Sequence, residues 1–344
     1  MNFQDPIQLI GATASPYTQK MLALLRYRRI PYTVTWGDPA KVCEALGIEP
    51  PKPALLPTFL VKNDAVVSAI CDSTPIIRHL EDAHRERSVL PADPALAFID
   101  YLIEDFADEW CTKYMFHYRW HFAEDADKAG TILPLAMETS ISEESIATFK
   151  KFFSERQIGR LFVVGSNDTT APVIDASYRR FLTAMEHHLA QQPFMLGNRP
   201  AAGDFGLQGQ LSQLVGFDPT PRGITHEVSP RTVAWVDRMY DLSGLAPTDS
   251  DWVNLEDQAS SLRELMQEIG RVYVPAQLAN AKAVLGGDKE WSCDIEGAPW
   301  TQRTFAYQAK CLQWTKARYA ALSQNDRNRV DDFLCGTGVE TMLS

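Results

Sequence analysis

The chain has 344 residues, of which 45% are hydrophobic and 22% charged, a globular composition with room for two domains or somewhat more. Its formal net charge of −11 disfavours nucleic acid as a partner. No apolar run is long enough for a membrane helix, and the N-terminus lacks a basic region followed by an apolar one. Neither a membrane protein nor an exported one is therefore expected.

The first predicted elements form a strand–helix–strand unit. Residues 7–11 are an apolar run ending in glycine, typical of a strand, and residues 32–36 are β-branched and aromatic. Between them, Ser15-Pro16 is a helix-start signal, because serine caps the first turn and proline suits it. The helix continues to residue 29, and its basic residues are expected at the solvent: Lys20, Arg28 and Arg29.

The next elements predict a second unit of two strands and a helix. After a short helix at 39–46, residues 58–61 and 65–67 read as strands around a turn at 62–64. The segment Asp72-Ser73-Thr74-Pro75 then opens a helix with one apolar face. The order is βαβ followed by ββα.

Beyond residue 94 the patterns are almost all helical. The predicted helices cover residues 96–120, 142–159, 175–191, 205–214, 230–240, 256–285 and 303–322. The stretch between the last two is predicted to be a small hairpin or a loop. The charge also changes near residue 90: 10 basic and 9 acidic residues precede that point, and 23 basic and 35 acidic residues follow it. We therefore expect three parts, at residues 1–90, 94–244 and 245–344, the last a mostly helical extension packed on the helical domain.

Four short patches stand out along the first 85 residues. Residues 9–17 read LIGATASPY, residues 30–32 read IPY, residues 55–60 read LLPTFL and residues 72–81 read DSTPIIRHLE. Together they resemble the soluble glutathione transferases: the first patch is similar to the first strand and active-site turn of the Ser-type, tau-type and bacterial members, and the third to the loop with the family's cis-proline. The resemblance implies an α+β fold, with an N-terminal thioredoxin-like domain followed by an enlarged all-helical C-terminal domain.

A fifth patch, FMLGNRPAAGDFG at 194–206, resembles the family's turn into the central helix. Ala201 stands where the family has a capping Ser or Thr, which removes one side-chain hydrogen bond. Asp204 is expected to keep its half of the capping box.

Ser15 is the candidate catalytic residue. A thiol such as that of glutathione is mostly protonated at neutral pH, whereas transferase chemistry needs the thiolate. A hydroxyl at a helix N-terminus can donate a hydrogen bond to the sulfur, and the helix dipole adds a favourable field. The alternative is that Ser15 only caps its helix.

The resemblance also implies the residues that would anchor glutathione. A cis peptide at Pro57 would aim the backbone of Leu56 at the cysteinyl unit of the ligand. The backbone N–H groups of Ser73 and Thr74 suit the γ-glutamyl carboxylate, and Asp72 could pair with its α-amino group. Capping of the helix is the alternative for Asp72 and Ser73, and the two roles are compatible.

The second-substrate pocket is assigned to the helix after the linker. The candidates are Tyr114, His117, Tyr118 and His121. His117 and His121 lie four residues apart and could pair on a metal, but no third ligand is evident, so we expect none. Ser15 and Thr18 stand where a redox Cys-x-x-Cys would have its sulfurs, which disfavours disulfide exchange.

The six cysteines show no zinc or disulfide spacing and, without an export signal, indicate reduced thiols in a cytoplasmic protein. The function expected from the resemblance is a glutathione S-transferase that uses glutathione as co-substrate, attacks a small hydrophobic electrophile in detoxification, and forms a homodimer. Two alternatives stay open: a glutathione-dependent isomerase, and a non-catalytic binding or scaffold protein. The Gly-Thr-Gly at residues 336–338 is too weak a signal for phosphate binding.

Overall fold

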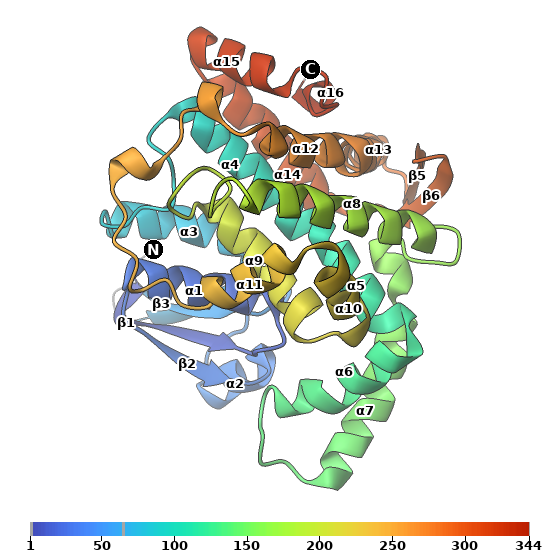
Figure 1. Ribbon diagram of the computed structural model, residues 1–344. Helices are drawn as coiled ribbons and strands as arrows, with labels where there is room; N and C mark the ends of the chain where they lie inside the picture. Colours follow the sequence, from blue (N-terminus) through green and yellow to red (C-terminus); the bar gives the residue numbers. More distant parts are fainter. Residues whose placement is uncertain (1–2, 64–65, 344) are drawn as a thin grey trace.

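The computed structural model describes residues 3–63 and 66–343, a small mixed sheet with its helices joined to a larger helical body (Figure 1). The N-terminal elements are β1 (Phe3–Gly11), α1 (Pro16–Arg28), β2 (Tyr32–Trp36), α2 (Pro39–Ala45), β3 (Thr58–Asn63), β4 (Val66–Ile70) and α3 (Ser73–Ala83). Asp64 of the predicted turn and Ala65 of the strand predicted after it lie outside the described residues.

The sheet has the strand order β2-β1-β3-β4. Strand β1 is parallel to β2, because α1 carries the chain back between them, and antiparallel to β3, which forms a hairpin with β4. This is the βαβ–ββα order expected from the sequence, and the predicted α+β fold class with a thioredoxin-like N-terminal domain is confirmed.

The two faces of the sheet are covered by different helices, since neighbouring residues of a strand point to opposite sides. Ile7, Leu9 and Phe59 are buried in the main core with α1 and α3. Ile10 and Leu60 form a smaller cluster with residues of α2 on the other face. Both faces are therefore closed, which leaves the loops at the ends of the strands to form a site.

The helical body follows the sheet in the chain. Its elements are α4 (Pro94–Phe106), a π-helix (Ala107–Cys111), α5 (Thr112–His121), α6 (Ala123–Leu135), α7 (Glu143–Ile158), a 3₁₀ turn (Leu161–Val164), α8 (Ala171–Leu189), α9 (Ala202–Gly216), α10 (Pro219–Val228) and α11 (Pro230–Met239). The single long helix predicted for residues 96–120 is interrupted by the π-helix, which the local sequence does not signal.

The last hundred residues lie against this body, at its upper side in Figure 1. They form short 3₁₀ turns (Asp249–Asp251, Leu255–Asp257), α12 (Ser260–Glu268), a π-helix (Ile269–Tyr273), α13 (Val274–Gly286), a hairpin of β5 (Glu290–Ile295) and β6 (Ala298–Arg303), α14 (Ala306–Ala321), α15 (Gln324–Leu334) and α16 (Glu340–Leu343). Helix α12 packs on α8, and α14 and α15 pack on α4. The hairpin is one of the two forms expected for residues 286–300.

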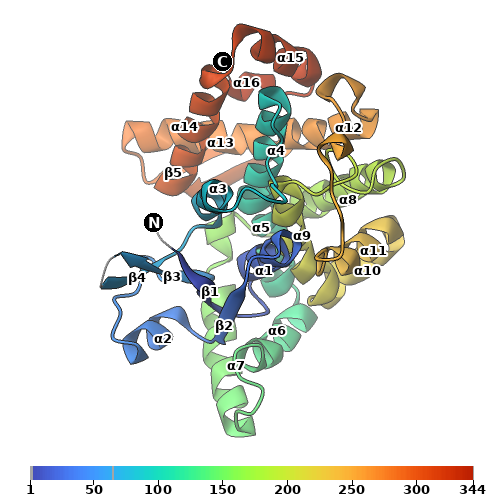
Figure 2. The same ribbon diagram turned by 90° about the vertical axis from the view of Figure 1, so that its left-hand side faces the viewer.

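Helix α9 lies in the middle of the helical body and packs against α1 (Figure 2). A side chain at Gly209 would meet the carbonyl oxygen of Pro16 at 2.5 Å, so only glycine allows the two helices to approach this closely. At the start of α9, Asp204 accepts hydrogen bonds from the backbone N–H groups of Ala201 and Met195, both at 2.9 Å. The expected half of the capping box is present, and α9 is fixed against the turn that carries Ser15.

The expectation that the basic residues of α1 face solvent is wrong for two of the three. Lys20 and Arg28 are 1% and 4% exposed, whereas Arg29 is exposed. Both buried side chains reach acidic partners from other helices: Lys20 pairs with Glu104, and Arg28 pairs with Glu81. A long basic side chain can be buried in this way when its charge is paired.

Candidate functional site

Ser15 is the N-cap residue of α1. Its Oγ accepts a hydrogen bond from the backbone N–H of Thr18 at 3.2 Å, and the residue is half-buried. The turn before it is held from two sides, because the carbonyl oxygen of Thr13 accepts from the side chains of Gln19 (2.8 Å) and Gln213 (3.2 Å). The cap bond uses a lone pair of Oγ and leaves the hydroxyl hydrogen free to donate to a ligand.

Tyr17 follows Ser15 but is engaged elsewhere. Its hydroxyl donates to the backbone carbonyl of Asp108 at 2.7 Å. Burial, with the charges of Glu109 and Asp108, raises the pKa of this phenol well above its ordinary value. Tyr17 therefore packs the module against the helical body.

The loop before β3 has the geometry that the resemblance implies. The Leu56–Pro57 peptide is cis, and Pro57 is buried while Leu56 is half-buried. Leu56 precedes β3, and the pairing of β3 with β1 begins at Thr58. Within the described residues, the backbone of Leu56 takes part in no strand pairing or turn hydrogen bond, so it is available to a ligand.

Asp72 does not cap α3. Its backbone has φ of +92°, a region that non-glycine residues rarely adopt, and its side chain makes no cap hydrogen bond. The carboxylate instead accepts a hydrogen bond at 2.8 Å from the hydroxyl of Tyr307, at the start of α14. Burial raises the pKa of Asp72, while the bond from Tyr307 and the charge of Lys20 oppose that shift. Capping of α3 is therefore not the role of the Asp72 side chain.

The side chains of Ser73 and Thr74 are tied to a buried ionic network. Lys20 Nζ donates to Ser73 Oγ (3.0 Å) and pairs with Glu104 (2.9 Å) and Asp108 (2.6 Å). Thr74 Oγ1 donates to the same two carboxylates, at 3.1 and 3.3 Å. Because the side chains are engaged inside the protein, only the backbone N–H groups at the start of α3 remain for a ligand carboxylate.

Charge balance explains the state of this network. Burial acts to raise the pKa of Glu104, but the positive charges of Arg78 and Lys20 outweigh it and lower that pKa. For Asp108, burial outweighs Lys20 and raises the pKa. Lys20 was missed as a site residue, although the acidic run at residues 104–109 in an apolar helix signals that a buried cation must pair with it.

Three of the four side chains predicted for the second-substrate pocket bond other elements, and the fourth, His121, contacts its own helix. Tyr114 and Tyr118 are fully buried and bond Ser177 and Asp175 of α8, both at 2.7 Å. His117 stacks on His121 with ring centroids 4.6 Å apart, and burial lowers the pKa of His117 to about 3. No group of three metal-ligating side chains occurs among the described residues.

A different face of α5 lies next to the Ser15 turn. Arg119 donates to the carbonyl oxygen of Ala14 at 3.2 Å, and Trp120 is buried in one apolar cluster with Ala14. Phe116 of α5 and Phe149 and Phe153 of α7 pack against this cluster. The sequence spacing shows which residues share a face of α5 but not which face meets the module, and this is why these aromatic residues were missed.

The six cysteines are all free thiols. Cys71, the cysteine nearest the anchors in sequence, is half-buried, and its Sγ lies 3.6 Å from the carbonyl oxygen of Pro53. Burial raises the pKa of Cys71, and burial with nearby acids raises that of Cys311 in α14. A raised pKa disfavours thiolate formation and therefore reactivity at both positions.

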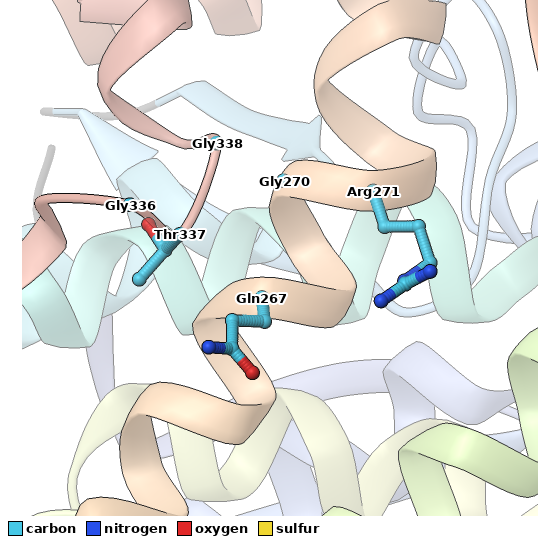
Figure 3. A pocket seen from close by; sticks show the side chains of 6 residues that line it. All are labelled: Gln267, Gly270, Arg271, Gly336, Thr337 and Gly338. Atoms are coloured by element: carbon cyan, nitrogen blue, oxygen red, sulfur yellow. The ribbon is translucent and has the colours of Figure 1, made fainter.

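The Gly-Thr-Gly segment at 336–338 has a packing role. It borders a shallow, open pocket of about 480 Å³, which Gln267, Gly270 and Arg271 also line (Figure 3). A side chain at Gly270 would lie 2.0 Å from the carbonyl oxygen of Thr337, so the glycine permits a close contact of two backbones. The N–H of Gly336 donates to Glu340 at 3.1 Å, so this backbone donor is used within the protein.

Ser15, the cis-proline loop and Asp72 lie in the loops that follow β1, precede β3 and follow β4 of a thioredoxin-like domain. Residues 9–88 match the family model described as "Glutathione S-transferase, N-terminal domain". Residues 9–88 therefore form a glutathione S-transferase N-terminal domain, as the sequence motifs predicted. None of the proteins with curated descriptions is significantly similar to the chain in sequence.

Solved structures of similar shape include several transferases. FzlA from C. crescentus is 15% identical and matches 75% of this chain and 98% of its own, with a TM-score of 0.42. A tau-class glutathione S-transferase from mango (Mangifera indica) is 16% identical over 76% of this chain and 99% of its own, with a TM-score of 0.41. The beta-etherase LigF from Sphingobium sp. is 18% identical over 68% and 94%, with a TM-score of 0.41. Similarity at this level carries no statement about activity.

None of the described helices is both long enough and apolar enough to cross a bilayer.

Proposed function

We propose that the protein binds glutathione at Ser15, Leu56-Pro57 and the start of α3, and stabilises its thiolate for attack on a small hydrophobic electrophile. The observation that carries the proposal is the half-buried hydroxyl of Ser15 at the N-terminus of α1, whose hydrogen is left free by the cap bond. One hydrogen bond to a charged group is worth about 1.5–3 kcal/mol, or one to two pKa units of the bound thiol.

The ligand would be oriented by its backbone contacts and its charged end. The free backbone of Leu56 suits the cysteinyl unit, the N–H groups of Ser73 and Thr74 suit a carboxylate, and Asp72 suits the ammonium group. The electrophile would lie against the apolar cluster beside Ala14, which Phe116 and Trp120 help to form. Catalysis would then consist of thiolate stabilisation and the positioning of two substrates.

That the protein is cytoplasmic and that it forms a homodimer remain expectations from the sequence. Light scattering measures the oligomeric state directly.

Calorimetric titration with glutathione tests the proposal. Asp72→Asn keeps the shape of the side chain but removes its charge, and we expect it to weaken binding about ten- to a hundredfold. Asp82→Asn, at an exposed acid of the same helix, is the control and should bind like the unmodified protein. Absence of glutathione binding by the unmodified protein, or equal binding by Asp72→Asn, would contradict the proposal.

A further inference from the structure

Tyr307 is held in place at the start of α14 by contacts within the extension. Asn280 pairs with the backbone of Phe305 through two hydrogen bonds, from its Nδ2 to the carbonyl oxygen (3.0 Å) and from the Phe305 N–H to its Oδ1 (2.8 Å). The ring of Tyr307 contacts those of Phe305 and Trp314, with centroids 6.1 and 6.0 Å apart. The hydroxyl thus reaches Asp72, 235 positions away in the chain, from a fixed base.

The conformation of Asp72 needs support from its surroundings. A non-glycine residue with φ of +92° is strained and persists only where its surroundings impose that conformation. The side chain makes no cap hydrogen bond by the usual geometry, and Tyr307 supplies a donor at 2.8 Å to Oδ2. A carboxylate accepts several hydrogen bonds, so Oδ1 stays available to a ligand.

Some of the other titratable groups around Asp72 raise the pKa of its carboxyl group, and others lower it. Lys20 from α1 favours its ionised form, and Glu104 from α4 disfavours it. The thiols of Cys71 and Cys311, from β4's end and from α14, also interact with its charge. Since burial disfavours the carboxylate as well, the hydrogen bond from Tyr307 is one of the few interactions that keep it ionised.

We propose that Tyr307 is a positioning residue of the thiol-ligand site: its hydroxyl orients the Asp72 carboxylate for the ammonium group of the ligand. The inference rests on the proposed function and adds that the C-terminal extension completes the site. Tyr307 itself touches Asp72 and not the reacting sulfur, so it acts on binding and leaves the chemistry at Ser15 unchanged.

Tyr307→Phe tests the inference, because phenylalanine keeps the ring contacts and removes only the hydroxyl. We expect glutathione to bind about five- to tenfold more weakly, and the loss of binding toward acid to begin at higher pH. Tyr319→Phe is the matched control, since Tyr319 lies on the same helix and also donates to an aspartate, Asp331, at 2.6 Å. It should bind as the unmodified protein does.

A double variant separates positioning from general packing. In an Asp72→Asn background, Tyr307→Phe should cause no further loss of affinity, because its effect passes through the charge of Asp72. Tighter binding by Tyr307→Phe would show that the extension obstructs the site. An unchanged affinity and pH profile would show that the contact is only structural. Either result overturns the inference.

The inference can also be judged if glutathione does not bind at all, which would refute the proposed function. The unfolding midpoints of the two single variants and the double variant then form a cycle without ligand. A non-additive effect at neutral pH that disappears in acid supports the coupling of Tyr307 to an ionised Asp72. Additive effects at both pH values contradict it.

Discussion

The two helix starts that form the candidate site are stabilised in different ways. At α1 the side chain of Ser15 caps the N-terminus by accepting a hydrogen bond from the backbone N–H of Thr18, and the neighbouring Pro16 suits the first turn. At α3 the corresponding residue, Asp72, makes no cap, and its partner is Tyr307 of the extension. One half of the site is therefore local in the sequence, and the other half depends on distant parts of the chain.

The largest effect is expected where distant residues meet at α3. Lys20→Met leaves the carboxylates of Glu104 and Asp108 without their shared cation, and removal of one partner of a buried ion pair costs about 3–5 kcal/mol. Urea unfolding measures the loss. Lys52→Met, which breaks an exposed pair with Glu49, should leave the midpoint unchanged. Similar midpoints for the two variants would contradict the role given to Lys20.

The pH dependence of the unfolding free energy tests Asp105, which lies on α4 next to Glu104. Asp105 accepts a hydrogen bond from Tyr273 of the extension, and burial raises its pKa to about 7. Because the folded protein then binds a proton that the unfolded chain has released, Asp105 contributes stability below about pH 4 that is lost as the pH rises to about 7. Asp105→Asn should reduce this decline in unfolding free energy, measured by urea unfolding across that range. A steeper decline in the variant would contradict the assignment.

The two serines allow a matched comparison of the helix starts. Ser73→Ala leaves the ammonium of Lys20 with one hydrogen bond fewer and should cost about 1.5–3 kcal/mol. Ser15→Ala removes a helix cap and should cost about 1 kcal/mol. Urea unfolding measures the loss of unfolding free energy in both variants. A larger loss for Ser15→Ala than for Ser73→Ala would contradict the expected order.

Sequence reasoning was most successful where the signals were local. The cap at Ser15, the βαβ–ββα order and the family resemblance all depend on residues within one turn or one strand, and the structure bears out the order and the cap. The cis peptide before Pro57 is present as the resemblance implies. Local caps and strand periodicity are imposed by the backbone itself, so they do not need tertiary information.

The remaining features of the candidate site depend on contacts between distant residues, which no local sequence pattern contains. The burial of Lys20 depends on acids 84 and 88 positions away, and Asp72 depends on Tyr307. On α5, the spacing grouped Tyr114 with Tyr118 correctly but could not tell which face meets the Ser15 turn. Side-chain direction on a buried helix is decided by packing against its neighbours.

The most direct test is the ionisation of glutathione bound to the protein. A pH titration of the ultraviolet thiolate absorbance, in the unmodified protein and in Ser15→Ala, measures the pKa of the bound thiol. We predict a pKa one to two units below the value of about 8.5 for a free thiol, and its return toward that value in Ser15→Ala with binding retained. The same titration curve in both proteins would contradict thiolate stabilisation by Ser15.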